Sequence, residues 1–104
     1  MTVRTIAGKS INFGDDGFMD NFNQWDPSVA EALAAEIGIT LTEDHWKVIE
    51  FCRSDFVVQG DAPTIRRITT VGGVPTKQLY QLFPKGPGKK VAYIAGLKKP
   101  TGCI

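Results

Sequence analysis

The chain has 104 residues, of which 42% are hydrophobic and 22% charged, and its formal net charge is +1. This composition is typical of a globular protein and excludes the disordered, collagen-like and disulfide-rich classes. No apolar run approaches the roughly 20 residues that span a bilayer, and the N-terminal segment lacks the pattern of a signal peptide. We therefore expect a single domain in the cytoplasm.

Charge is distributed unevenly along the sequence. Residues 1–61 contain all eleven acidic residues against four basic ones, whereas residues 62–104 contain eight basic residues and no acidic one. If this segregation persists in the fold, the second half offers a basic surface to an acidic protein, an anion or RNA. Alternatively, the two halves neutralise each other across the fold, and the sequence favours neither interpretation.

The first predicted elements are a β-hairpin and a helix. Residues 3–6 and 10–13 are short runs of β-forming residues separated by a glycine-containing turn. Further along, Asp26 is an N-cap residue followed by proline, apolar residues recur at helical spacing, and Gly38 is typical of a helix end. These signals predict a helix over residues 27–37.

A second helix is predicted from Thr42 to about Val58. Thr42 is a hydroxyl cap, and two acidic residues in the first turn interact favourably with the helix dipole. The predicted apolar face contains Trp46, Ile49, Cys52 and Phe56. We therefore expect Cys52 to be a buried apolar residue without a redox role. His45, the only histidine, is expected to be a capping or surface residue.

Three shorter helices complete the predicted fold, which is mainly α. Breaks at residues 60–63 and 72–75 each open a helix, and together these two helices have the outline of a helix-turn-helix unit. Pro87 begins the last helix and Gly96 ends it. The body of the protein is thus predicted to span residues 1–96.

Residues 97–104 are predicted to form a flexible C-terminal arm. Pro100 and Gly102 oppose regular structure in this segment. Eight extended residues reach about 25 Å. The arm therefore has the length to enter a partner protein.

Cys103 is the candidate nucleophile of the sequence. A cysteine next to the chain end is difficult to bury, and its thiolate is the reactive form. Lys98 and Lys99 favour ionisation of the thiol, whereas the C-terminal carboxylate opposes it. Cys52 and Cys103 have no CxxC motif and no histidine companion, so we expect neither a metal nor another cofactor.

The C-terminal sequence resembles that of a known family. Residues 82–89 (LFPKGPGK) and 95–104 (AGLKKPTGCI) are similar to the C-terminal signature of the DsrC/TusE family. This family comprises the gamma subunit of dissimilatory sulfite reductase and the TusE sulfur-relay proteins. The resemblance extends over almost the whole chain. Further similar positions are Gly8, Lys9, residues 16–18, Trp25, residues 41–46, residues 62–66, Leu79 and Tyr80.

The resemblance implies a helical body with a helix-turn-helix-like unit, a small hairpin, and a mobile arm whose penultimate cysteine handles sulfur. Cys103 matches that cysteine. Members that work with the sulfite reductase carry a second cysteine eleven positions earlier, where this chain has Ala92. This difference removes two-thiol trisulfide chemistry, unless Ala92 is an engineered replacement. Arg66 matches the family's Pro-x-x-Arg position and is, with Lys98 and Lys99, the candidate for docking the arm or tuning its thiolate.

The leading hypothesis is a TusE-like persulfide carrier, which takes sulfur from a donor protein and delivers it to an acceptor, ultimately for tRNA 2-thiouridine synthesis. Such a protein is a sulfurtransferase-type carrier rather than an independent turnover enzyme. The short connection over residues 69–75 and the residues Thr101 and Gly102 look more like those of the sulfite-reductase partners. A DsrC-like partner or substrate of dissimilatory sulfite reductase is therefore the first alternative. A helix-turn-helix nucleic-acid-binding module is the second, although Lys77 is the single lysine on the expected recognition helix.

Overall fold

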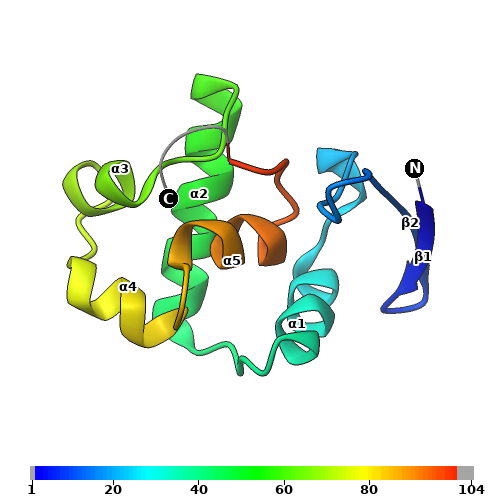
Figure 1. The fold of residues 1–104 in the computed structure, drawn as a ribbon, viewed down its shortest axis with the longest axis horizontal. Coiled ribbons are helices and arrows are strands. Elements are labelled where there is room, and N and C mark those ends of the chain that lie inside the picture. The colour runs from blue at the N-terminus through cyan, green and yellow to red at the C-terminus, as the bar shows by residue number, and fades with distance from the viewer. Residues whose placement is uncertain (1, 101–104) are drawn as a thin grey trace.

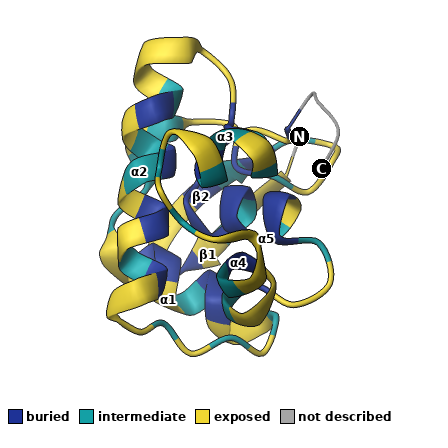
Figure 2. Ribbon diagram, turned by 90° about the vertical axis from the view of Figure 1, so that its left-hand side faces the viewer, coloured by how far each residue is buried: buried dark blue, intermediate teal, exposed yellow. Residues whose placement is uncertain are grey.

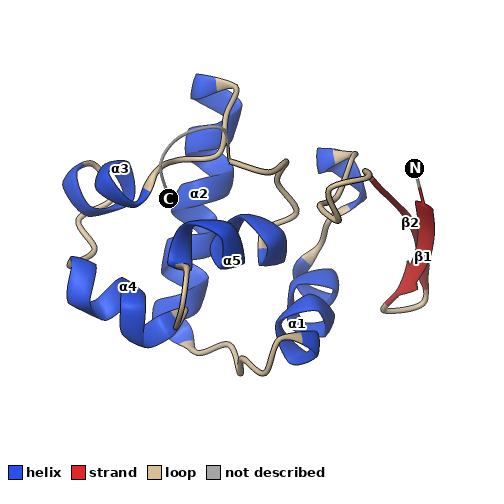
Figure 3. Ribbon diagram, in the orientation of Figure 1, coloured by secondary structure: helices blue, strands red, loops and turns tan. Residues whose placement is uncertain are grey.

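The computed structural model describes residues 2–100. In that range the chain forms a two-stranded hairpin followed by one short 3₁₀ helix and five α-helices (Figures 1 and 3). The elements are β1 (Thr2–Ile6), β2 (Lys9–Phe13), η1 (Phe22–Gln24), α1 (Pro27–Glu36), α2 (Glu43–Gln59), α3 (Ile65–Thr70), α4 (Thr76–Leu82) and α5 (Pro87–Ile94). The predicted mainly helical domain with an N-terminal hairpin is confirmed. None of these helices is long and apolar enough to cross a membrane.

The hairpin lies at one end of the molecule, beside α1 (Figure 1). Its strands are antiparallel, Ile6 lies opposite Lys9, and Ala7 and Gly8 both adopt positive φ, as a type I′ turn requires. Buried side chains of the hairpin, the loop that follows it and α1 form a small hydrophobic cluster. The cluster contains Ile6, Ile11, Phe13, Met19, Val29 and Leu33. Burial of these side chains attaches the hairpin to the helical body.

The two ends of α1 follow the signals in the sequence. The Asp26 side chain accepts a hydrogen bond from the Val29 main-chain N–H at 3.0 Å, which caps the first turn. At the other end, Gly38 has a φ of +75°, a left-handed conformation that favours glycine. The helix ends at Glu36, one residue before the predicted end.

The longest helix of the described chain, α2, passes behind α5 and contributes to the main core (Figures 1 and 2). At its start, His45 Nδ1 accepts a hydrogen bond from the Thr42 main-chain N–H at 3.1 Å, and its Nε2 donates to the Leu82 carbonyl at 2.8 Å. His45 is therefore a capping residue, and it is buried. Cys52 is fully buried, as predicted. The main core includes Val48, Ile49, Cys52, Ile68, Leu79, Phe83, Val91 and Ile94.

A tight turn joins α3 to α4. A Cβ at Gly72 would lie 2.6 Å from the Ile68 carbonyl oxygen and 3.1 Å from the Phe51 ring, so only glycine fits this close approach. Ile68 from α3 and Leu79 from α4 are both buried in the main core. The predicted helix-turn-helix-like unit is thus present, and its two helices pack against α2 and α5.

Candidate functional site

The main chain leaves α5 at Gly96, on the way to the C-terminal segment that carries the candidate thiol. Gly96 has a φ of +71°, its N–H donates to the Tyr93 carbonyl at 3.3 Å, and the Leu97 N–H donates to the Ala92 carbonyl at 3.0 Å. These are the two hydrogen bonds of a Schellman motif. Leu97 is 1% exposed and packs in the main core. Leu97 and Pro100, both in the segment predicted as the arm, are thus buried against the body.

Three side chains from other segments hold this exit point. Trp25 Nε1 donates to the Ile94 carbonyl at 2.8 Å, and Arg53 Nη1 donates to the Ala95 carbonyl at 2.7 Å. The Arg53 guanidinium contacts the rings of Phe22 and Trp25, with its Cζ atom 3.8 Å and 3.9 Å from the two ring centroids. We call Phe22, Trp25 and Arg53 the arginine clamp. Together with the Schellman motif, the clamp provides hydrogen-bond donors for the last carbonyls of α5.

The clamp also requires glycine at position 96. A Cβ there would lie 2.5 Å from Trp25 Cδ1, well inside van der Waals contact distance. The left-handed backbone of Gly96 independently favours glycine. The exit of the main chain from α5 is therefore determined by both backbone conformation and side-chain packing.

Arg53 keeps its positive charge although it is partly buried. Burial lowers the pKa of Arg53 to about 10, which still leaves the guanidinium protonated at neutral pH. A cation at a helix C-terminus interacts favourably with the helix dipole and the last carbonyls. The faces of the two rings add cation–π attraction. The clamp is therefore electrostatically suited to the end of α5.

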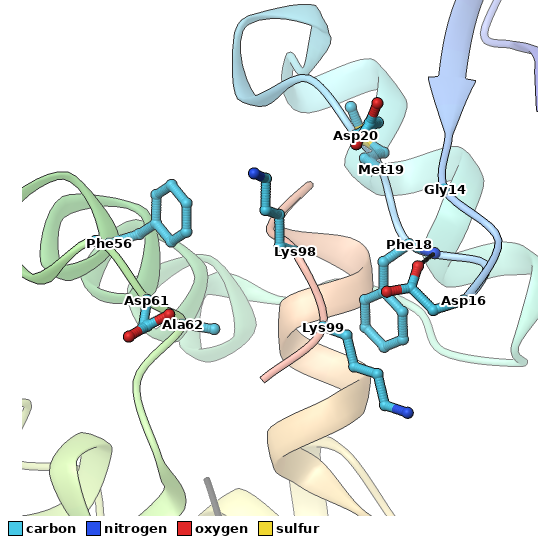
Figure 4. Close-up of a pocket in the computed structure, with 11 residues that line it drawn as sticks. Gly14, Asp16, Phe18, Met19, Asp20, Phe56, Asp61, Ala62, Lys98 and Lys99 are labelled. Carbon is cyan, nitrogen blue, oxygen red and sulfur yellow. Dashed lines mark hydrogen bonds between the residues drawn. The ribbon is translucent and has the colours of Figure 1, made fainter. Parts of the chain in front are cut away.

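A cavity of about 280 Å³ lies beside the residues that follow the clamp (Figure 4). The segment with Lys98 and Lys99 passes between the end of α2 and the loop after β2 (Figure 4). Asp16, Asp20 and Asp61 also line the cavity. The acidic first half and the basic second half of the sequence thus meet here, which favours mutual neutralisation for this part of the surface. Within residues 2–100, no group of His, Cys, Asp or Glu side chains is arranged to hold a metal ion.

The structure brings the two predicted lysines together at the cavity but places Arg66 elsewhere. Arg66 is exposed on α3, does not line this cavity, and forms no ion pair with a described carboxylate. Its neighbour Arg67 instead donates from Nε and Nη2 to the two carboxylate oxygens of Asp55, each at 2.7 Å. Ala92 is buried in the main core. Cys103 lies outside the described residues, so its role and that of Arg66 stay predictions.

Sequence reasoning did not identify the arginine clamp. One signal was present, because Arg53 stands four residues after Ile49 and three before Phe56, on the face predicted to be apolar. A charged residue at such a position indicates a partner within the fold. The partner itself could not be predicted, because Arg53 bonds to main-chain carbonyls, which every residue type has.

Comparison with known proteins relates the whole chain to one group. The family model described as DsrC like protein matches residues 5–104. The chain is 40% identical to the gamma subunit of dissimilatory-type sulfite reductase from Nitratidesulfovibrio vulgaris, over 100% of both chains. It is 38% identical to the sulfurtransferase TusE from Yersinia pseudotuberculosis, over 95% of this chain and 98% of that protein.

Solved structures share the fold. A chain in the crystal structure of dissimilatory sulfite reductase I (DsrI) matches with a TM-score of 0.85 and 36% identity, over 99% of this chain and 100% of that one. The NMR structure of Allochromatium vinosum DsrC matches with a TM-score of 0.82 and 37% identity, over 99% and 100% of the two chains. The family match and these near full-length similarities show that the chain belongs to the DsrC-like protein family.

Proposed function

We propose that this chain carries sulfane sulfur as a persulfide on Cys103 and delivers it to a partner protein. The observation that carries the proposal is the state of the other cysteine. Cys52 is fully buried, and burial raises the pKa of its thiol well above the ordinary value. It therefore neither meets a partner nor provides a thiolate. Cys103 is the other cysteine of the sequence, and we therefore assign the sulfur chemistry of the family to it.

The proposed transfer needs no external oxidant or reductant. The Cys103 thiolate attacks the outer sulfur of a donor persulfide, a new S–S bond forms, and the donor's S–S bond breaks to release the donor thiolate. The product is Cys103 with one additional sulfur atom. An acceptor nucleophile then attacks that outer sulfur, and the Cys103 thiolate leaves. Because Ala92 replaces the second family cysteine, one thiol performs both steps.

The proposed arm gives Cys103 its reach. Three residues lead from Pro100, the last buried residue of the described chain, to Cys103, and six lead from Leu97 in the main core. A three-residue segment spans at most about 10 Å, and a six-residue segment spans about 20 Å if Pro100 detaches from the body. This length takes a thiol into a recessed active site while the helical body stays outside. Lys98 and Lys99 at the base of the segment favour the thiolate over the thiol.

The proposed partners are a sulfur-donor and a sulfur-acceptor protein of a TusE-like relay, with tRNA thiolation as the final use of the sulfur. Ala92 supports this choice over two-thiol chemistry. We place the exchange in the cytoplasm, where thiols stay reduced. A DsrC-like partner or substrate protein of dissimilatory sulfite reductase is the second candidate, supported by the 40% identity to a gamma subunit over the full length of both chains.

The nucleic-acid-binding interpretation of the helix-turn-helix-like unit is not favoured. Lys77 is the single basic residue of α4, whereas groove binding usually needs several phosphate contacts. The buried residues of α3 and α4 take part in the main core, so the unit has a packing role.

The carrier proposal is tested by intact-mass measurement. After incubation with a cysteine desulfurase charged with cysteine, the protein should gain about 32 Da, and reduction should remove the added mass. Cys103→Ser should abolish the gain, because oxygen cannot form the persulfide. Cys52→Ala is the matched control and should load normally. Sulfur loading of the Cys103→Ser variant would contradict the assignment.

A further inference from the structure

The end of α5 is held by groups that belong to two distant parts of the sequence. The last carbonyls of a helix have no partner within the helix and bond to side chains, water or a tightened last turn. Here Trp25, which follows η1, donates to the Ile94 carbonyl, and Arg53 of α2 donates to the Ala95 carbonyl. The second Arg53 donor, Nη2, bonds to the Phe22 carbonyl at 3.2 Å. One side chain thus ties η1, α2 and the exit of α5 together.

The clamp restricts direction as well as position. Hydrogen bonds to carbonyls depend on the orientation of each peptide plane, and two successive carbonyls are held here. The next residue, Gly96, lies against the Trp25 ring so closely that a Cβ has no room. Residues 94–96 therefore cannot rotate without breaking a hydrogen bond or displacing the ring. The path of the main chain as it leaves α5 is set at this point.

We propose that Arg53 and Trp25 are positioning residues that fix the origin and direction of the Cys103-bearing segment for transfer of sulfur between proteins. This inference rests on the proposed carrier function. A tethered thiol reaches a partner's active site at an effective concentration that depends on tether length and on where the tether begins. The clamp keeps the tether short by holding its base against the body.

The expected size of the effect follows from the tether length. With the clamp intact, three residues separate the buried Pro100 from Cys103. If residues 95–100 detach from the body, the nearest core residue is Ile94, and the tether lengthens to nine residues. Effective concentration falls roughly as the −3/2 power of length, which corresponds to about a fivefold loss. Loss of direction adds to this factor.

A distance measurement tests the positioning directly. Nitroxide labels are placed on Cys103 and on Lys77→Cys, an exposed position of α4, in a Cys52→Ala background. Arg53→Lys keeps the charge but loses the planar fork, and it should broaden the distance distribution between the labels. Trp25→Phe keeps the ring but loses the N–H donor and should broaden it less. Arg67→Lys is the matched control, because it alters an arginine fork away from α5, and it should leave the distribution unchanged.

A kinetic measurement tests the consequence. Arg53→Lys should lower kcat/KM for loading by a cysteine desulfurase charged with cysteine about fivefold, while loading of Cys103 by inorganic polysulfide stays unchanged. A wild-type distance distribution in Arg53→Lys, or equal slowing with both donors, would overturn the positioning role. If wild-type protein accepts sulfur from neither donor, the carrier function fails, and the distance distribution alone decides whether the clamp positions the segment.

Discussion

Two arginines hold different regions of this molecule in different ways. Arg67 joins α3 to α2 through both oxygens of the Asp55 carboxylate. Arg53 of α2 lies beside the end of α5. It donates hydrogen bonds to the carbonyls of Phe22 and Ala95 and packs against two aromatic rings. The hydrogen bond to Asp55 raises the pKa of Arg67, whereas burial lowers the pKa of Arg53 to about 10. An arginine side chain is thus stabilised by a carboxylate in one region, and by carbonyl dipoles and the faces of aromatic rings in the other.

The comparison separates helix packing from chain positioning. A carboxylate on a rotatable side chain follows its arginine when two helices shift slightly, so the Asp55–Arg67 pair tolerates small movements. A main-chain carbonyl turns only with the backbone, so the hydrogen bonds of Arg53 define the path of the chain around Ala95. The α2–α3 contact therefore stabilises the body, and the arginine clamp determines where the C-terminal segment begins.

We expect the largest disruption of the arginine clamp from a substitution at Gly96. In Gly96→Ala the new Cβ meets the Trp25 ring at 2.5 Å, and the residue must also adopt a left-handed backbone. We expect the free energy of unfolding to fall by about 3 kcal/mol in urea denaturation. The labelled distance distribution of Cys103 should broaden as it does for Arg53→Lys.

Gly38→Ala is the matched control for this substitution. Gly38 has a φ of +75°, close to that of Gly96, but a Cβ there would have no heavy atom within 4 Å. Gly38→Ala therefore has the energetic cost of a left-handed backbone without a steric clash. We expect its free energy of unfolding to fall by about 1 kcal/mol. Equal losses at the two glycines would show that contact with the Trp25 ring adds nothing to the positioning of residue 96.

The packing of the helical body can be tested through the pH dependence of its stability. The titrating group is Cys52, which lies one helical turn before Asp55. Burial, and to a lesser degree the Asp55 charge, raise the pKa of the Cys52 thiol. The unfolded chain loses this proton above a pKa of about 8.5, whereas the folded chain retains it. Stability is therefore fully present below that pH and falls above it, by up to about 1.4 kcal/mol per pH unit. Urea unfolding between pH 8 and 10.5 measures this slope.

Cys52→Ala removes the titrating thiol and should flatten the slope by this amount, although the cavity that it leaves lowers the stability at every pH. Cys103→Ser is the control that removes the other thiol. The difference in slope between variants is the informative quantity, because groups common to all variants contribute equally to it. Identical slopes in the wild-type and Cys52→Ala proteins would mean that Cys52 is accessible to water.

Several elements of the fold could be predicted because their signals are local. The Asp26 cap and Gly38 identify the ends of α1, and the spacing of apolar residues indicates the buried face that includes Cys52. Leu97, which the sequence prediction assigned to the arm, packs in the core for a physical reason. Gly96 ends α5, but in a Schellman motif the following residue still bonds back to the helix and packs its side chain, which is the position of Leu97.

The arginine contacts could not be predicted, because nothing local distinguishes one arginine from another. Arg66 and Arg67 are adjacent on α3, yet Arg67 binds Asp55 and Arg66 is exposed. Which of the two meets α2 depends on how α3 is rotated against it, and a six-residue helix carries too little periodicity to fix that rotation. The partners of Arg53 are main-chain carbonyls, which no sequence pattern marks.

Substitution of Arg66 should have the smallest effect on stability, in contrast to substitution of Arg53 or Arg67. It has no described ion pair, so Arg66→Ala should change the free energy of unfolding by less than about 0.5 kcal/mol. Our sequence-based prediction is that its charge docks the arm or favours the Cys103 thiolate. One charge at about 6 Å in water contributes about 0.7 kcal/mol, so sulfur loading from a protein donor should slow about threefold.

Lys77→Ala is the matched control for Arg66→Ala, because it removes one exposed positive charge from the neighbouring helix α4. Loading rates at 20 mM and 500 mM salt should differ between the two variants, since a local charge contribution from Arg66 weakens as salt screens it. If both variants load at the wild-type rate, Arg66 is an ordinary surface residue. Positioning of the Cys103 segment then depends on the arginine clamp, where the charge is held against carbonyls and rings instead of facing solvent.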